Sequence, residues 1–146
     1  MDFHYLARAI FFKNGKVLLA HARGSEHTFL PGGHIEMGEP AENTLLRELQ
    51  EELGWQAHIG RFIGAVEHTW QGYGEDNHEI NLLFEVDSAA ADPQVNPVSC
   101  EEMLDFTWAA VDELDKYNLY PASIRECLRT WDSAYHGFWG RIQQDE

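Results

Sequence analysis

Apolar residues near the N-terminus fall into two short runs that are typical of β-strands. Residues 3–12 are rich in aromatic and aliphatic side chains, and residues 17–22 form a second apolar run. Between them, residues 13–16 read Lys-Asn-Gly-Lys, and an Asn-Gly pair is a strong signal for a two-residue hairpin turn. The pattern therefore predicts a β-hairpin at the start of the chain.

Three further apolar stretches predict strands later in the chain. Residues 55–70 carry spaced apolar side chains and predict one long or interrupted strand. Residues 78–86 predict a strong strand, and residues 106–111 predict a short one. Residues 88–99 contain Pro93 and Pro97, so we expect an irregular segment before the last strand.

Residues 40–53 show the spacing of an amphipathic α-helix. Pro40 suits the first turn, and Gly54 suits the position just after the last turn. At about 100° per residue, one side of this helix is apolar and is expected to face the core. That apolar side consists of Leu46, Leu49 and Leu53. A second helix is predicted from Pro121 to about Tyr135.

The resulting order of elements is β-β-α-β-β-β-α, which predicts a mixed α/β (α+β) fold. A chain of 146 residues has the length of one domain, so we expect a single domain over residues 1–146. The apolar fraction of 44% favours a packed core over a disordered chain. Periodicity alone leaves open how the helices pack against the sheet.

The first predicted helix also carries an acidic side. Glu48, Glu51 and Glu52 stand at positions i, i+3 and i+4 and therefore share one face. Without a cation, such carboxylates repel each other by about 0.2–0.5 kcal/mol per pair. A solvated acidic surface is one interpretation, because glutamate is frequent in this chain. A site for a hard divalent cation is the other, because Mg²⁺ and Mn²⁺ prefer carboxylate oxygens.

The spacing of the surrounding residues favours the metal site. Residues 33–55 read GHIEMGEPAENTLLRELQEELGW, which contains the pattern G-x5-E-x7-R-E-(apolar)-x-E-E-x-G. With the residue usage of this chain, the pattern arises by chance about once in 10⁵. It resembles the signature of the Nudix hydrolases, the family related to MutT, at each fixed position. Only Trp55 departs, at a closing position that is aliphatic in the family.

This resemblance implies both a fold and a chemistry. The implied fold is a Nudix-type mixed β-sheet sandwiched between α-helices, with the signature forming a loop–helix–loop. The implied activity is metal-dependent hydrolysis of a diphosphate linkage, with Mg²⁺ or Mn²⁺ as the cofactor. Bound metal would neutralise the phosphate oxygens and make an attacking water more acidic.

The resemblance also assigns roles to individual residues. The implied metal ligands are the carboxylates of Glu48, Glu51 and Glu52 and the backbone carbonyl of Gly32. Arg47 is implied to orient a catalytic carboxylate, although its spacing to Glu51 also fits a plain ion pair within the helix. Gly33 and Glu39 are implied to support the site, and Glu39 also fits a simple charge at the helix N-terminus.

The reaction needs a carboxylate that accepts a proton from water, and we predict Glu52 for this role. Members of the family differ here, and some use an acid from a later loop. The later candidates are Glu79, Glu102 and Asp105. Asp105 is favoured among them because it precedes Trp108 by three positions, a place where the resemblance to MutT-like proteins implies an acid. Each of the three also fits a plain surface carboxylate.

For the substrate, the sequence offers candidates only. Phe29, Trp70 and Tyr73 flank predicted loops and suit stacking on a base, with a place in the core as the alternative. Arg23 and His27 precede the two glycines and are candidates for phosphate contact, with a place in a plain loop as the favoured alternative. We expect a nucleoside triphosphate, or a nucleoside diphosphate linked to another moiety. The alternatives are a non-catalytic Nudix-fold sensor of a nucleotide or metabolite, and a purely structural partner protein.

The charge of the chain limits its partners. Ten Lys and Arg against 25 Asp and Glu give a net charge of −15. This field disfavours duplex nucleic acid and anionic membranes, and it opposes a polyphosphate unless a bound cation reverses the sign locally. The sequence has no apolar run long enough for a membrane span and no apolar leader, so we expect a cytoplasmic protein.

Two further expectations concern thiols and assembly. Cys100 and Cys127 are far apart in sequence and are expected to be free, buried thiols. Homodimers are common in the family that the signature resembles, and the sequence leaves the oligomeric state open.

Overall fold

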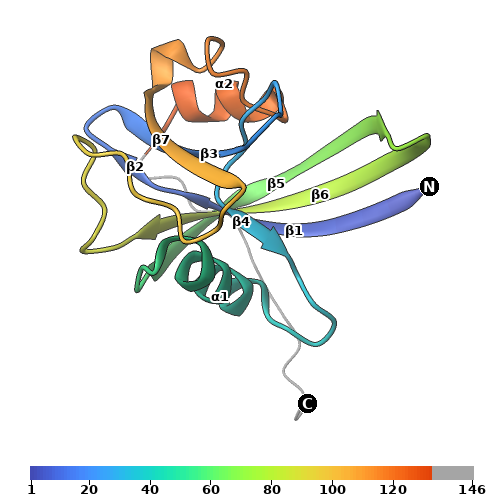
Figure 1. The fold of residues 1–146 in the computed structure, drawn as a ribbon, viewed down its shortest axis with the longest axis horizontal. Coiled ribbons are helices and arrows are strands. Elements are labelled where there is room, and N and C mark those ends of the chain that lie inside the picture. Colours follow the sequence, from blue (N-terminus) through green and yellow to red (C-terminus); the bar gives the residue numbers. More distant parts are fainter. Residues whose placement is uncertain (133–146) are drawn as a thin grey trace.

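The computed structural model describes residues 1–132. In this part of the chain the backbone forms strands, two α-helices and one short 3₁₀-helix (Figure 1). The strands are β1 (Asp2–Ile10), β2 (Phe12–Lys13), β3 (Lys16–Ala22), β4 (Gly32–His34), β5 (His58–Gly72), β6 (Glu75–Asp87) and β7 (Leu104–Ala110). The helices are α1 (Ala41–Leu53), the 3₁₀-helix η1 (Val111–Glu113) and α2 (Ser123–Arg129).

Within residues 1–132 the strands form two sheets. The larger sheet has the order β4-β1-β6-β5, and it is mixed because β1 runs parallel to β6 while the other pairs are antiparallel. The smaller sheet, β2-β3-β7, is antiparallel. Helices α1 and α2 lie on opposite sides of the strands (Figure 1). The predicted mixed sheet sandwiched between helices in a single domain is therefore confirmed.

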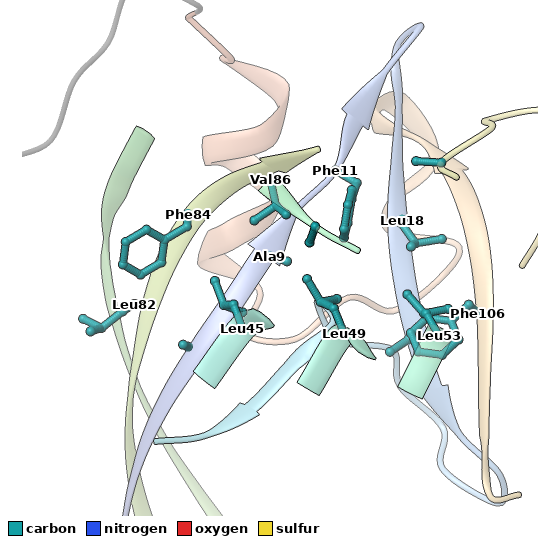
Figure 2. Packing of buried hydrophobic residues seen from close by; sticks show 14 of the residues in the cluster. Ala9, Phe11, Leu18, Leu45, Leu49, Leu53, Leu82, Phe84, Val86 and Phe106 are labelled. Atoms are coloured by element: carbon teal, nitrogen blue, oxygen red, sulfur yellow. The ribbon is translucent and has the colours of Figure 1, made fainter. Parts of the chain in front are cut away.

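The core beneath α1 joins the two sheets. Leu45, Leu49 and Leu53 belong to one buried cluster with Ala9 of β1 and Phe106 of β7 (Figure 2). Helix α2 packs on a second cluster, which includes apolar residues of β3 and β6. Because α1 contacts both sheets, its orientation is fixed at its apolar side, and its acidic side has a defined place.

The prediction of the apolar side of α1 is wrong at one residue. Leu46 is 40% exposed, whereas Leu45 is fully buried. Leu45, Leu49 and Leu53 are each four residues apart and form one stripe along the helix, and Leu46 lies about 100° away from Leu45.

The predicted N-terminal hairpin is confirmed only next to its turn, where β2 pairs with β3. The rest of the predicted first strand, β1, pairs with β4 and β6 in the other sheet. The predicted end of α1 at Leu53 is confirmed. Gly54 follows in the left-handed conformation, with φ 67°, as a residue at that position should. Pro40 precedes the helix in an extended conformation, so it caps α1 and does not belong to its first turn. The long strand β5 is interrupted by register shifts on either side of Phe62.

Other boundaries differ from prediction. Residues 32–34 pair with β1 as the short strand β4, which their glycine-rich sequence did not indicate. Helix α2 begins at Ser123, and its predicted end near Tyr135 lies outside the described residues. Both cysteines are free, but Cys100 is exposed, contrary to the prediction of buried thiols. No helix in residues 1–132 is long and apolar enough to cross a membrane, and the cytoplasmic location stays a prediction.

Candidate active site

The acidic side of α1 is graded by depth. The side chain of Glu51 is 51% exposed, whereas that of Glu48 is only 17% exposed. Glu52 is half-buried, and its Oε2 atom is buried without a hydrogen-bond partner among residues 1–132. A buried carboxylate oxygen with no partner is costly. Its presence here indicates a place where a ligand completes the site.

The surroundings of Glu52 oppose its negative charge. The pKa of Glu52 is raised to about 8. Burial is the largest cause, followed by the negative charge of Glu48 and a hydrogen bond with Glu48. The positive charge of Arg8 acts in the opposite direction. A cation between the two carboxylates would relieve this unfavourable interaction. The oxygen donors therefore fit Mg²⁺ or Mn²⁺.

Arg47 ties this acidic pair to the preceding loop. Its Nη1 donates to Glu48 Oε1 at 3.0 Å, while its Nε and Nη2 donate to the two oxygens of Glu39, each at 2.9 Å. The Glu39 contact is a two-point bond that fixes the plane of the guanidinium. Its charge and hydrogen bonds hold Glu48 in one orientation, which matches the supporting role predicted for Arg47.

Glu39 is held as firmly as its partner. Besides Arg47, its Oε1 accepts a hydrogen bond of 2.6 Å from the hydroxyl of the buried Thr44. The hydrogen bonds from Arg47 and Thr44 lower the pKa of Glu39 to about 2. Glu39 therefore acts through specific contacts, and not only as a charge near the helix N-terminus.

Two glycines of β4 let the strand approach β1 and α1 closely. At Gly32, φ is 141° and an added Cβ would lie 2.0 Å from the carbonyl oxygen of Ala7. At Gly33, an added Cβ would lie 2.5 Å from Oε1 of Glu48. Glycine is thus required at Gly32 by the backbone and at Gly33 by the carboxylate.

Glu51 stands apart from the other two carboxylates. Its nearest charged partner is Arg47, with Nη1 3.6 Å from Oε2. Within residues 1–132, no three acidic, imidazole or thiol groups converge as a ready-made metal site. Glu48 and Glu52 form the pair, and Glu51 would join it by turning its exposed side chain away from Arg47.

A cavity of about 450 Å³ has Arg8 in its lining, whereas Glu48 and Glu52 do not line it. The charges of Glu79, Glu52 and Glu48 all act on the Arg8 guanidinium. Burial has the larger effect and lowers the pKa of Arg8 from its usual value. Arg8 is therefore the link between the acidic pair and the cavity. The lining includes the aromatic residues Phe29, Trp70, Tyr73 and Tyr120.

Residues 3–130 of the chain match the NUDIX domain. The chain belongs to the Nudix family. Nucleoside triphosphatase NudI from Escherichia coli O81 (strain ED1a) is 33% identical over 107 residues, which span 68% of this chain and 72% of that protein. This Nudix protein is accordingly a hydrolase that acts on phosphoric anhydride bonds.

Solved structures share the Nudix fold. The E. coli ORF135 protein is 27% identical, with a TM-score of 0.65 over 92% of this chain and 96% of that chain. The MutT NUDIX hydrolase from Burkholderia pseudomallei has a TM-score of 0.67 at 24% identity, over 88% of this chain and 98% of that chain.

The fold brings most of the predicted Nudix signature residues together. Arg47 contacts Glu39 and Glu48, and Gly33 abuts Glu48. The predicted stacking residues Phe29, Trp70 and Tyr73 all line the cavity, and so does His27. Their roles in binding and catalysis stay predictions.

Two predicted residues lie elsewhere. Arg23 and Asp105 form an ion pair of 3.3 Å in which both side chains are more than half exposed. The later acid whose charge acts on Glu52 is Glu101. The backbone amide of the preceding residue, Cys100, donates to the carbonyl of Glu52 at 2.7 Å, and this hydrogen bond brings Glu101 near the site. Sequence reasoning missed this contact, since the irregular segment before β7 carries no pattern that fixes its path.

Sequence reasoning also missed Arg8 and Asn81. Arg8 is a charged residue inside an otherwise apolar strand, which was the one available signal. Asn81 is buried in β6 at 1% exposure, and its side chain accepts from Arg8. Their meeting depends on the parallel pairing of β1 with β6, which the sequence alone did not show.

Proposed function

We propose that this Nudix hydrolase is a metal-dependent pyrophosphohydrolase of a nucleoside triphosphate, or of a nucleoside diphosphate linked to another moiety. The observation that carries the proposal is the unpartnered, buried Oε2 of Glu52 beside Glu48. Both glutamates interact through their charges with Arg8, which lines a cavity with aromatic residues. The similarity to nucleoside triphosphatase NudI supports a triphosphate substrate.

In this proposal Glu48, Glu52 and the carbonyl of Gly32 hold Mg²⁺ or Mn²⁺, with Glu51 completing the set. When bound, the metal supplies positive charge opposite the diphosphate and makes a nearby water more acidic. Arg47 keeps Glu48 in place from the Glu39 side, and Gly33 leaves room for the Glu48 carboxylate.

Glu52 is the proposed proton acceptor. One of its carboxylate oxygens is buried without a hydrogen-bond partner among residues 1–132, and its raised pKa supports a role in accepting a proton. Glu101 lies near enough to add negative charge, so we propose it, ahead of Asp105, as the later acid that assists.

The test is a panel of nucleoside triphosphates and nucleoside diphosphate derivatives, assayed for released phosphate with Mg²⁺ or Mn²⁺ and an auxiliary phosphatase. We expect turnover of at least one compound, and a loss of about 10²–10⁴-fold in kcat for Glu52→Gln. Glu67→Gln is the control, because Glu67 is an exposed acid on β5. No turnover of any compound would refute the function, and full activity of Glu52→Gln would refute its role.

A further inference from the structure

Three polar side chains form a row along the floor of the aromatic cavity. The amide oxygen of the buried Asn81 accepts a hydrogen bond from Arg8 Nε at 3.3 Å. Its amide nitrogen donates to Glu79 Oε1 at 2.9 Å. Arg8 and Glu79 both line the cavity on either side of Asn81.

The two ends of this row have opposite and fixed hydrogen-bonding character. A carboxylate only accepts and a guanidinium only donates, so the orientation of the Asn81 amide between them is determined. Glu79 is further fixed by Trp70, whose Nε1 donates to Oε2 at 3.2 Å. Arg8 is fixed by a second bond, from Nη1 to the carbonyl of Leu30 at 3.2 Å.

Both ends keep capacity for a ligand. An ionised carboxylate has about four acceptor sites and a guanidinium has five N–H donors, which exceeds the contacts just described. The floor therefore offers an acceptor at Glu79 and a donor at Arg8, with the Asn81 amide between them.

The walls of the cavity suit a flat ring. Phe29 and Trp70 line it, and the Arg8 guanidinium stands 5.2 Å from the Phe29 ring centroid. Aromatic walls bind nucleobases by stacking, which by itself hardly distinguishes one base from another. Discrimination among bases must come from the polar floor.

Resting on the proposed function, we propose that Glu79 and Arg8 select nucleotides whose base carries an amino group and a ring carbonyl on either side of one ring nitrogen. Cytosine and guanine have this edge. The amino group donates to Glu79 and the carbonyl accepts from Arg8. Uracil and thymine place a second carbonyl against the Glu79 carboxylate, and adenine has no carbonyl for Arg8. A buried polar group left unpaired is what rejects the wrong base.

The test is calorimetric binding of CMP, GMP, UMP and AMP to the full chain. We expect CMP or GMP to bind about tenfold or more tightly than both UMP and AMP, and the better of the two identifies the base. Glu79→Gln is expected to reduce this preference to about threefold or less. The side-chain amide N–H of the introduced Gln would then face the amino group of the base, and two donors cannot bond to each other. Glu67→Gln, on the exposed side of β5, should keep it.

Equal affinity for all four monophosphates, or a preference unchanged in Glu79→Gln, overturns the proposal. If Glu79→Gln does not fold, Glu79→Asp serves instead: it should weaken CMP and GMP binding and leave UMP and AMP binding unchanged. Monophosphate binding requires no catalysis. Turnover without a base preference in monophosphate binding would therefore refute this inference alone. Absence of turnover would refute the proposed function, and the monophosphate binding measurement would still test the base preference.

Discussion

Glu39 precedes the helix that carries the acidic pair, yet it fixes the side chain that holds Glu48. Arg47 could adopt many rotamers on the surface of α1, and the two-point bond to Glu39 selects one of them. Thr44 in turn fixes Glu39 from the first turns of the helix. The spacing of eight residues between Glu39 and Arg47 is thus a geometric requirement of the Nudix signature, since it closes the loop onto the helix.

Glu39→Gln should weaken the fold in a pH-dependent way. The folded pKa of Glu39, about 2, lies below the usual 4.5. The ionised carboxylate therefore stabilises the fold above pH 4.5, and this stabilisation is lost as the pH falls toward 2. We expect the free energy of unfolding at pH 7 to drop by about 1–2 kcal/mol relative to wild type. Urea titrations at several pH values measure this difference.

The difference between wild type and Glu39→Gln should shrink between pH 5 and pH 2.5. Glu36→Gln is the matched control, because Glu36 is an exposed acid of the same loop, 3.9 Å from Arg47. A difference that stays constant over this range would show that Glu39 stabilises the fold by packing and not by its charge.

At the level of elements, the two adjacent glycines of β4, Gly32 and Gly33, are needed for different reasons. Gly32→Ala would place a Cβ against backbone of β1, which cannot move aside, so we expect loss of the folded state. Gly33→Ala would meet only the end of the Glu48 side chain, which can rotate. We expect this variant to fold with a kcat reduced by about 10²-fold, because displacement of a catalytic group by about 1 Å is that costly.

Circular dichroism and phosphate-release assays on the two variants separate these effects. Wild-type activity in Gly33→Ala would mean that Glu48 has another way to reach the metal. A stable Gly32→Ala protein would contradict the close contact between β4 and β1.

Helix α1 offers a test of the corrected apolar stripe. Leu49→Ala removes a fully buried side chain and should cost about 2–5 kcal/mol of unfolding free energy. Leu46→Ala removes a side chain that is 40% exposed and should cost less than about 1 kcal/mol. Chemical denaturation of both variants measures the two values. Equal costs would place Leu46 in the core, as its spacing first indicated.

The sequence predicted α1 and its site well, because both depend on contacts within a short segment. Arg47, Glu48 and Glu52 are neighbours on one helix, and Gly54 ends it through local backbone preference. The floor of the cavity was beyond prediction, because Arg8 and Asn81 are 73 residues apart and meet only when β1 pairs with β6. The displaced candidate Asp105 shows the same limit, since its partner Arg23 comes from another part of the chain.

At the level of the whole molecule, the net charge of −15 works against an anionic substrate. The acidic pair adds to this repulsion, and the burial of Glu52 makes the metal-free site unfavourable in itself. In the proposed function, a bound divalent cation would offset both costs.

This linkage predicts that Mg²⁺ or Mn²⁺ stabilises the protein. At a concentration of about 100 times the Kd, metal binding to the folded state alone contributes about 2.7 kcal/mol, which corresponds to a rise in Tm of roughly 5–10 °C. Glu52→Gln should lose this rise, yet unfold without metal at the same or a higher temperature than wild type, because its amide is neutral and requires no cation beside Glu48. Scanning calorimetry with Mg²⁺, and with NaCl of equal ionic strength as control, measures both effects. A rise that persists in Glu52→Gln, or that NaCl reproduces, would mean that the cation screens the general negative charge and does not bind between Glu48 and Glu52.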